Sequence, residues 1–83
     1  MAHPPHDQLN WNEMSIQDIL ELAIADEIEA REYYRHAAGL TGDLHTRRML
    51  TGLADMEQGH ADTLRKELEE LRLQRDLETG MVD

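Results

Sequence analysis

Apolar residues recur every three or four positions along most of the chain, and this spacing predicts two long helices rather than strands. The first apolar run covers residues 15–38 and the second covers residues 43–78, with a short turn between them. The segments on either side, residues 1–14 and 80–83, lack this periodicity and are expected to be a flexible N-terminal tail and a C-terminal tail. The pattern therefore predicts an all-α fold, an antiparallel two-helix hairpin.

Residues with strong capping preferences stand at the expected helix boundaries. Ser15 precedes the first helix and Asp18 occupies its third helical position, which is the arrangement of a capping box. Gly39 is expected to end this helix as a left-handed C-cap. Thr41 or Asp43 is expected to cap the second helix.

Steps of four and three along each helix define a seam that we expect to form the core. In the first helix the seam consists of Ile16, Leu20, Ala23, Glu27, Ala30, Tyr34 and Ala37. In the second helix it consists of Leu50, Leu53, Glu57, His60, Leu64, Leu68 and Leu71. Both seams are interrupted near the middle by polar residues. Because an antiparallel hairpin brings these two positions level, we expect Glu27 to lie beside Glu57 and His60.

These three polar residues predict a metal site. An ionised carboxylate in a dry core costs several kcal/mol unless it is paired, protonated or bound to a metal, and neither seam contains Lys or Arg. Glu-x-x-His alone is a weak signal in a chain with 18 acidic residues and five His. The alternative is a core histidine hydrogen-bonded to Glu57 or Glu27. The coincidence of Glu27, Glu57 and His60, with Tyr34 one helical layer away, favours a metal.

The size of the chain points to a need for additional stabilisation. With 83 residues it forms one small domain, and a core of this size is barely sufficient alone. The absence of Cys excludes disulfides and Cys-ligated metals, which leaves an O/N-ligated metal or partner subunits. Two hairpins can pair into a four-helix bundle, so we expect a homodimer at minimum. Such a dimer would bring together four carboxylates and two imidazoles, enough for two metal ions.

Charge and hydropathy narrow the classes of partner. A net charge of −10 disfavours nucleic acid, and no apolar stretch is long enough to suggest a membrane segment or a signal peptide. We therefore expect a cytoplasmic protein.

Some polar and apolar side chains near the seams have two possible interpretations. The acidic residues Asp26, Glu29 and Glu32 lie on neighbouring faces of the first helix, where a solvated surface is slightly favoured over a path that guides cations to Glu27. Beside the second seam, we expect Met49 and Met56 to fill gaps in the core rather than to contact the edge of a haem.

Two segments resemble the ferritin-like di-iron superfamily: Glu27-Ile-Glu-Ala-Arg-Glu-Tyr-Tyr34 and Glu57-Gln-Gly-His60. Over residues 15–73 the chain most closely resembles the two-helix encapsulated ferritins, with rubrerythrins next. The resemblance implies that Glu27, Glu57 and His60 bind iron, and that Tyr34 is a neighbour of the metals with a role in catalysis. It also implies that two subunits complete a site for two Fe ions, and that such dimers form a larger ring.

The same resemblance implies an activity and a partner. Encapsulated ferritins are ferroxidases, which oxidise Fe(II) for storage or detoxification and pass iron into an encapsulin shell. Asp26 and Glu29 fall where that family carries acidic residues of an iron uptake site. Two departures stand out: Tyr33 replaces an expected Trp, and the C-terminal residues 77–83 contain no apolar peptide for docking to a shell.

Two alternative functions remain open from the sequence. One is a rubrerythrin-like protein that reduces peroxide, although the Cys-ligated domain that normally supplies its electrons cannot be part of this chain. The other is a structural helical module that dimerises through its seam without metal. If a metal is bound, Mn, Zn or Ca would accept similar ligands to iron, because affinity alone does not select among them.

Overall fold

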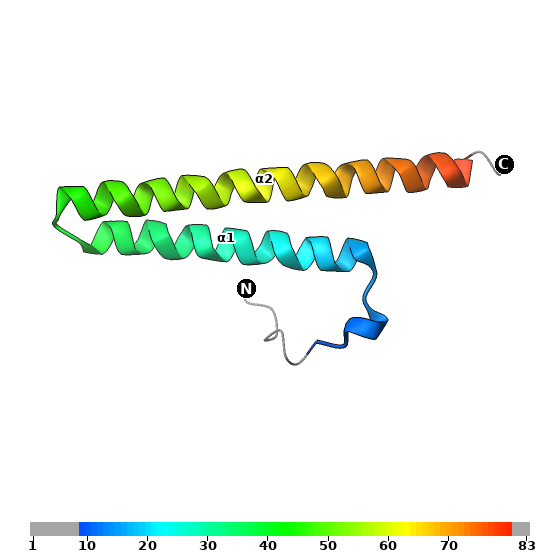
Figure 1. Cartoon of the computed structure of the whole chain (residues 1–83), viewed down its shortest axis with the longest axis horizontal. Coiled ribbons are helices and arrows are strands. Elements are labelled where there is room, and N and C mark those ends of the chain that lie inside the picture. Colours follow the sequence, from blue (N-terminus) through cyan, green and yellow to red (C-terminus); the bar gives the residue numbers. More distant parts are fainter. Residues whose placement is uncertain (1–8, 81–83) are drawn as a thin grey trace.

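Two long helices packed side by side make up the architecture. The computed structural model describes residues 9–80, with side chains up to residue 77. A short 3-10 helix, η2 (Trp11–Glu13), leads into α1 (Ile16–Leu40), which is followed after a tight turn by α2 (Leu44–Gly80). The helices are antiparallel, and α2 extends well beyond the start of α1 (Figure 1). The predicted all-helical hairpin is confirmed, whereas the predicted dimer stays a prediction.

The predicted tails are described only in part. Residues 1–8 and 81–83 lie outside the described residues. Within the predicted N-terminal tail, η2 adds a turn of helix that periodicity did not reveal, and α2 is described as far as Gly80. No helix among residues 9–80 is long and apolar enough to cross a membrane.

The start of α1 is fixed by the predicted capping box. The backbone N–H of Asp18 donates to the Ser15 hydroxyl at 3.1 Å, and the Ser15 N–H donates to the Asp18 carboxylate at 3.1 Å. Two N–H groups that helix geometry leaves without partners are thus satisfied reciprocally. The capping box therefore determines where α1 begins, and so the position of each later residue along the helix axis.

The turn between the helices differs from the prediction. Gly39 is not a left-handed C-cap: α1 continues through it to Leu40, and no described glycine has a positive φ. The helix ends instead at Thr41, which has extended backbone angles, and Arg47 donates to the Thr41 carbonyl oxygen at 2.9 Å. Asp43, not Thr41, caps α2, because its carboxylate accepts from the Thr46 N–H at 2.8 Å.

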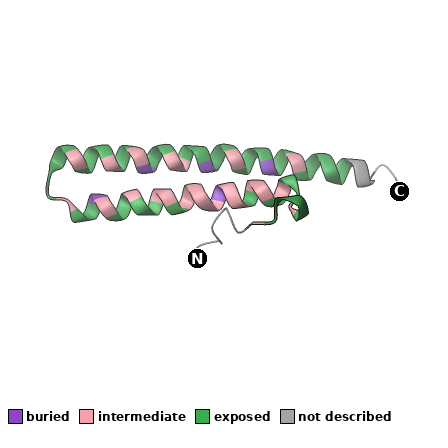
Figure 2. Cartoon of the chain, turned by 60° about the horizontal axis from the view of Figure 1, so that its bottom comes forward, coloured by how far each residue is buried: buried purple, intermediate pink, exposed green. Residues whose placement is uncertain are grey.

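The contact between the helices follows a line of mostly small residues. The buried residues are Ile24, Ala38, Ala54, Ala61 and Leu68. Figure 2 shows them on the facing sides of the two helices. Within each helix they are separated by multiples of seven residues, the period of two helices that pack along a seam. Alanine at this contact allows the two backbones to approach closely.

The predicted seam is displaced from this line. Of its members only Leu68 is buried; the rest are half-buried, apart from exposed Ile16 and His60. Met49 and Met56 were expected to fill core gaps, but each remains about half exposed. The reason is geometric: two helices bury only one narrow stripe of each, and the seam lies on the neighbouring face. The hairpin therefore keeps an unusually large part of its apolar surface in contact with solvent.

Candidate metal centre

Three predicted ligand residues come together midway along the hairpin. Glu27 on α1 and Glu57 and His60 on α2 each offer one ligand atom, and these atoms lie within 4.8 Å of one another. Nδ1 of His60 lies 3.5 Å from Oε2 of Glu27 and 3.8 Å from Oε1 of Glu57. The structure thus brings together all three residues that the sequence placed level with one another.

Helix geometry explains how each side chain reaches the cluster. Glu57 and His60 are three residues apart, so both lie on the same side of α2. Glu27 reaches a similar height from α1, because it lies about as many residues before the short turn as Glu57 and His60 lie after it. The two glutamate side chains are 26% and 19% exposed, but His60 is 54% exposed. The cluster therefore lies along one open edge of the hairpin rather than inside it.

Neither carboxylate is bound by a described lysine or arginine, and the basic side chain next to both is that of His60. Oε2 of Glu27 is buried and forms no hydrogen bond with any described residue. Arg31 is the basic residue closest to Glu27 in the sequence, but its guanidinium group binds Glu32 and Gln58 instead. A buried carboxylate oxygen without a donor is costly. The orphaned oxygen therefore fits a site that is completed by a cation.

The crowding of the carboxyl groups also changes the acidity of Glu57. Its pKa is raised, first because the Glu27 carboxyl group favours a proton shared between them. Partial burial and the charge of Glu27 raise it further, while His60 opposes the change. Two acidic side chains at close range are expected to behave in this way. A divalent cation bound between the two carboxylates would remove this repulsion.

The donor set and the adjoining space are suited to a metal ion. Two carboxylates and one imidazole are ligands that iron, manganese and zinc all accept. A shallow pocket of about 280 Å³ opens beside the cluster and is lined by Glu27, His60, Thr63 and Leu64. One hairpin thus supplies part of a coordination sphere, with open space where further ligands would enter.

The other residues singled out from the sequence lie outside this cluster. Tyr34 is half-buried and packs edge-on against Tyr33, with ring centroids 5.6 Å apart, and the described residues include no hydrogen bond from it to the three ligands. Asp26 is half-buried and Glu29 exposed, and neither belongs to the group of three. The roles of Tyr34, Asp26 and Glu29 stay predictions.

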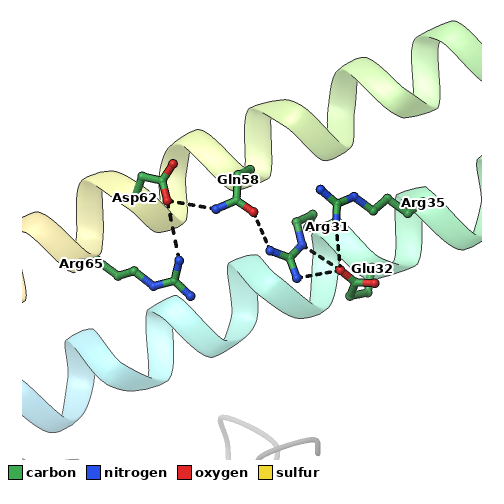
Figure 3. A network of polar contacts seen from close by, with 6 residues as sticks. All are labelled: Arg31, Glu32, Arg35, Gln58, Asp62 and Arg65. Carbon is green, nitrogen blue, oxygen red and sulfur yellow. Dashed lines mark hydrogen bonds and ion pairs between the residues drawn. The ribbon is translucent and has the colours of Figure 1, made fainter.

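One polar feature next to the cluster escaped the sequence reasoning. Arg31 lies on the contact line between the helices and donates to Gln58, within a network of six residues that crosses from α1 to α2 (Figure 3). A signal for this was available: Arg31 is seven residues after Ile24 and seven before Ala38, both of which are buried.

Fold and site together define a class of protein. A glutamate from one helix and Glu-x-x-His from its antiparallel partner form half of the ligand set of the ferritin-like di-iron bundles. In agreement, the rubrerythrin family matches residues 18–81, which include both helices. The chain therefore belongs to the rubrerythrin family, within the ferritin-like di-iron superfamily, and this membership implies iron binding. No curated protein and no solved structure matches the chain.

Proposed function

We propose that this protein is a ferroxidase, which oxidises Fe(II) with dioxygen at a di-iron site formed between two copies of the hairpin. The observation that carries the proposal is the unpaired carboxylate pair, Glu27 and Glu57, beside His60 on an open edge. Membership of the rubrerythrin family supports an iron-dependent oxidoreductase of this general kind.

A second copy of the chain is proposed because one hairpin offers only three ligands. Two copies related by a two-fold axis would provide four glutamates and two histidines, the complete ligand set of a di-iron bundle. The exposed apolar side chains support such pairing, since Met49 and Met56 lie on the helix that carries Glu57 and His60. Further association into a ring and location in an encapsulin shell stay predictions of the sequence resemblance.

In this proposal the side chains of the protein bind the iron substrate and manage its charge. Glu27 and Glu57 bind Fe(II) through oxygen, and His60 binds through Nδ1, the ring nitrogen that faces both carboxylates. The close approach of the two carboxylates raises the pKa of Glu57, and a bound Fe(II) ion would relieve this crowding by neutralising their charge. Two Fe(II) ions each lose one electron, and dioxygen accepts these two electrons with two protons to give hydrogen peroxide.

Peroxide reduction is a second candidate, favoured by the rubrerythrin family match. The same ligands would hold two Fe(II) ions, and hydrogen peroxide would accept two electrons and two protons to give water. The absence of Cys means that these 83 residues cannot contain a Cys-ligated electron-transfer centre, so a separate donor would have to reduce the iron again. The relative rates with dioxygen and with peroxide decide between the two activities.

The test is anaerobic loading of the purified protein with Fe(II), followed by mixing with dioxygen or hydrogen peroxide in a stopped-flow spectrophotometer. We expect about one iron per chain, metal-dependent dimerisation in light scattering, and faster oxidation with dioxygen. Glu57→Ala should abolish iron binding and rapid oxidation, whereas Glu21→Ala, which removes an exposed carboxylate outside the cluster, should retain both. Undiminished oxidation by Glu57→Ala would contradict the proposal, and a lack of stoichiometric iron would favour a structural dimerisation module.

A further inference from the structure

The contact between the two helices becomes polar in its middle. Ile24 and Ala38 are buried on α1, and Arg31 lies halfway between them in the sequence with its side chain only 20% exposed. On α2 the contact is formed by Ala54 and Ala61, whose side chains are small and almost completely buried. About one helical turn from Glu27, a guanidinium group therefore takes the place of an apolar side chain.

Each end of this guanidinium group has a defined partner. Nη1 of Arg31 donates to Oε1 of Gln58 across the helix contact. Nε donates to Oε1 of Glu32 at 2.8 Å, and Nη2 forms an ion pair with the same oxygen at 2.7 Å. The Gln58 amide is held at its other end too, because Nε2 donates to Asp62 at 2.9 Å. Figure 3 shows that Arg31 and Gln58 form the link of the network between the helices. Gln58 is thus fixed on both sides.

We call the Arg31–Gln58 hydrogen bond the bridge. Its Gln58 end and the metal cluster lie on opposite flanks of the line along which the two helices meet. Successive residues of a helix are about 100° apart, so Gln58 projects to one side of the Ala54–Ala61 line and Glu57 to the other. Gln58 is nevertheless the neighbour of Glu57 in the chain and lies inside the Glu-x-x-His motif. Any rotation or sliding of α2 that displaced Gln58 would displace Glu57 and His60 with it.

Precise alignment matters for a metal site shared between helices. Ligand distances must lie within about 0.2 Å of their preferred values, whereas a shift of one residue along a helix moves each side chain by about 1.5 Å. Next to the cluster, α2 contributes Ala54 and Ala61 to the contact, and these small side chains interlock with α1 less than large ones would. A directional hydrogen bond in the same region defines the alignment much better.

We propose that Arg31 and Gln58 are positioning residues for the metal centre. Their bridge sets the height and rotation of α2 against α1 so that Glu27 faces Glu57 and His60. The bonds from Arg31 to Glu32 also hold the guanidinium group away from the cluster, which leaves the ligand carboxylates free for a cation. This inference rests on the proposed metal site, and neither residue is expected to touch the metal.

A second inter-helix bond provides a matched control. Arg72 on α2 binds Glu21 on α1 at 2.7 Å, and both side chains are about half exposed. Glu21 is six residues before Glu27 and Arg72 is twelve residues after His60, so this ion pair is remote from the cluster. Arg72→Met removes a cross-link between the same two helices without touching the bridge next to the ligands.

Co(II) is the probe, because its visible absorption reports both affinity and ligand geometry. We expect Gln58→Leu and Arg31→Met each to weaken Co(II) binding about tenfold, within the range seen when groups supporting a ligand are removed, and to change the spectrum. The double variant should be no worse than either single variant. Gln58→Glu combined with Asp62→Asn keeps an acceptor for Arg31 and a donor–acceptor pair between positions 58 and 62, so this double variant should retain the wild-type affinity and spectrum. Arg72→Met should leave both as in the wild type.

The outcomes separate this inference from the proposed function. Wild-type affinity and spectrum in Gln58→Leu, or an equal loss in Arg72→Met, would overturn the positioning role while leaving the metal site intact. A wild-type protein that binds no Co(II) would overturn both. Thermal unfolding of the metal-free variants supplies an independent readout: similar midpoints for Gln58→Leu and Arg72→Met, with only the former losing Co(II), would support positioning rather than a general loss of stability.

Discussion

Both flanks of the α1–α2 contact contain acidic side chains, but the two sets differ in their exposure to water and in their basic partners. On one flank, Glu32 and Asp62 are more than half exposed, yet each is bound by arginine. On the other, Glu27 and Glu57 are largely screened from water, yet the described residues include no arginine or lysine bound to them. Stability alone would favour the reverse arrangement, since water already stabilises an exposed carboxylate.

The contrast places the electrostatic cost of this hairpin at the proposed metal site. The paired flank is electrostatically complete and can fix the two helices against each other. The unpaired flank is complete only when a cation is added, and it opens onto a pocket and exposed apolar surface where a second copy could pack. The following predictions test this contrast.

The largest expected effect is on metal affinity. Glu27→Gln or Glu57→Gln removes one ligand charge while keeping the shape of the side chain, so Co(II) affinity should fall by at least about 100-fold. Glu21→Gln makes the same chemical change at an exposed carboxylate that Arg72 binds, and it should alter affinity less than about threefold because Glu21 is remote from the cluster. Isothermal titration calorimetry measures both. Equal losses in the cluster and at Glu21 would mean that the metal responds only to net charge.

The next effect is stabilisation by the metal. A ligand that binds only the folded state, present at about 100 times its Kd, adds about 2.7 kcal/mol to the free energy of unfolding. Mn(II), which does not react with dioxygen as Fe(II) does, should therefore raise the thermal midpoint of the wild type, and a chelator should reverse the rise. Glu57→Gln should show almost no shift at the same Mn(II) concentration. A shift as large as in the wild type would place the binding site elsewhere.

A smaller effect concerns pH in the metal-free protein. The pKa of Glu57 is raised in the folded state above its ordinary value of 4.5. The folded state therefore holds this proton more tightly than the unfolded state, and Glu57 destabilises the fold once pH rises through the folded pKa. Glu57→Gln removes this cost, so the variant should be more stable than the wild type at pH 7 in a chelator. The advantage should disappear below pH 4.5, where both states are protonated.

Asp43 provides the opposite sign as an internal comparison. Hydrogen bonds from the Thr46 side chain and backbone lower the pKa of Asp43, despite a small opposing effect of burial. Its carboxylate therefore stabilises the fold above pH 3.8, and that contribution is lost as pH falls through the lower folded pKa. Thermal midpoints measured over a series of acidic pH values should show that Asp43→Ala is less stable than the wild type at neutral pH and that this difference disappears at low pH. Glu57→Gln should be more stable than the wild type at neutral pH, and that difference should disappear at low pH too.

The smallest effect is expected from the exposed ion pairs of the paired flank. Arg65 lies 3.6 Å from Asp62, and both side chains are at least half exposed. Arg65→Met should change the free energy of unfolding by less than about 1 kcal/mol, because solvent screens such pairs. The change should shrink further in high salt. A larger loss in urea unfolding would show that this outer pair is part of the cross-link between helices.

The sequence predicted much of the fold because the relevant signals are local. The Ser15–Asp18 capping box and the uninterrupted periodicity of both helices depend only on neighbouring residues. Counting outward from the turn then placed Glu27 level with Glu57 and His60, since the rise per residue is the same in both helices. By contrast, a left-handed conformation at Gly39 was wrong, because Arg47 satisfies the end of α1 from the next helix.

Only the tertiary structure decided how each helix is rotated about its own axis. A periodic pattern marks a broad apolar face, and any stripe within that face could meet the partner helix. Close packing selected the stripe with Ala54 and Ala61, which displaced Glu27, Glu57 and His60 to one edge and moved Arg31 onto the contact. The sequence by itself thus determined which residues share a height along the hairpin. The packing of one helix on the other determined which of them face a partner, a cation or solvent.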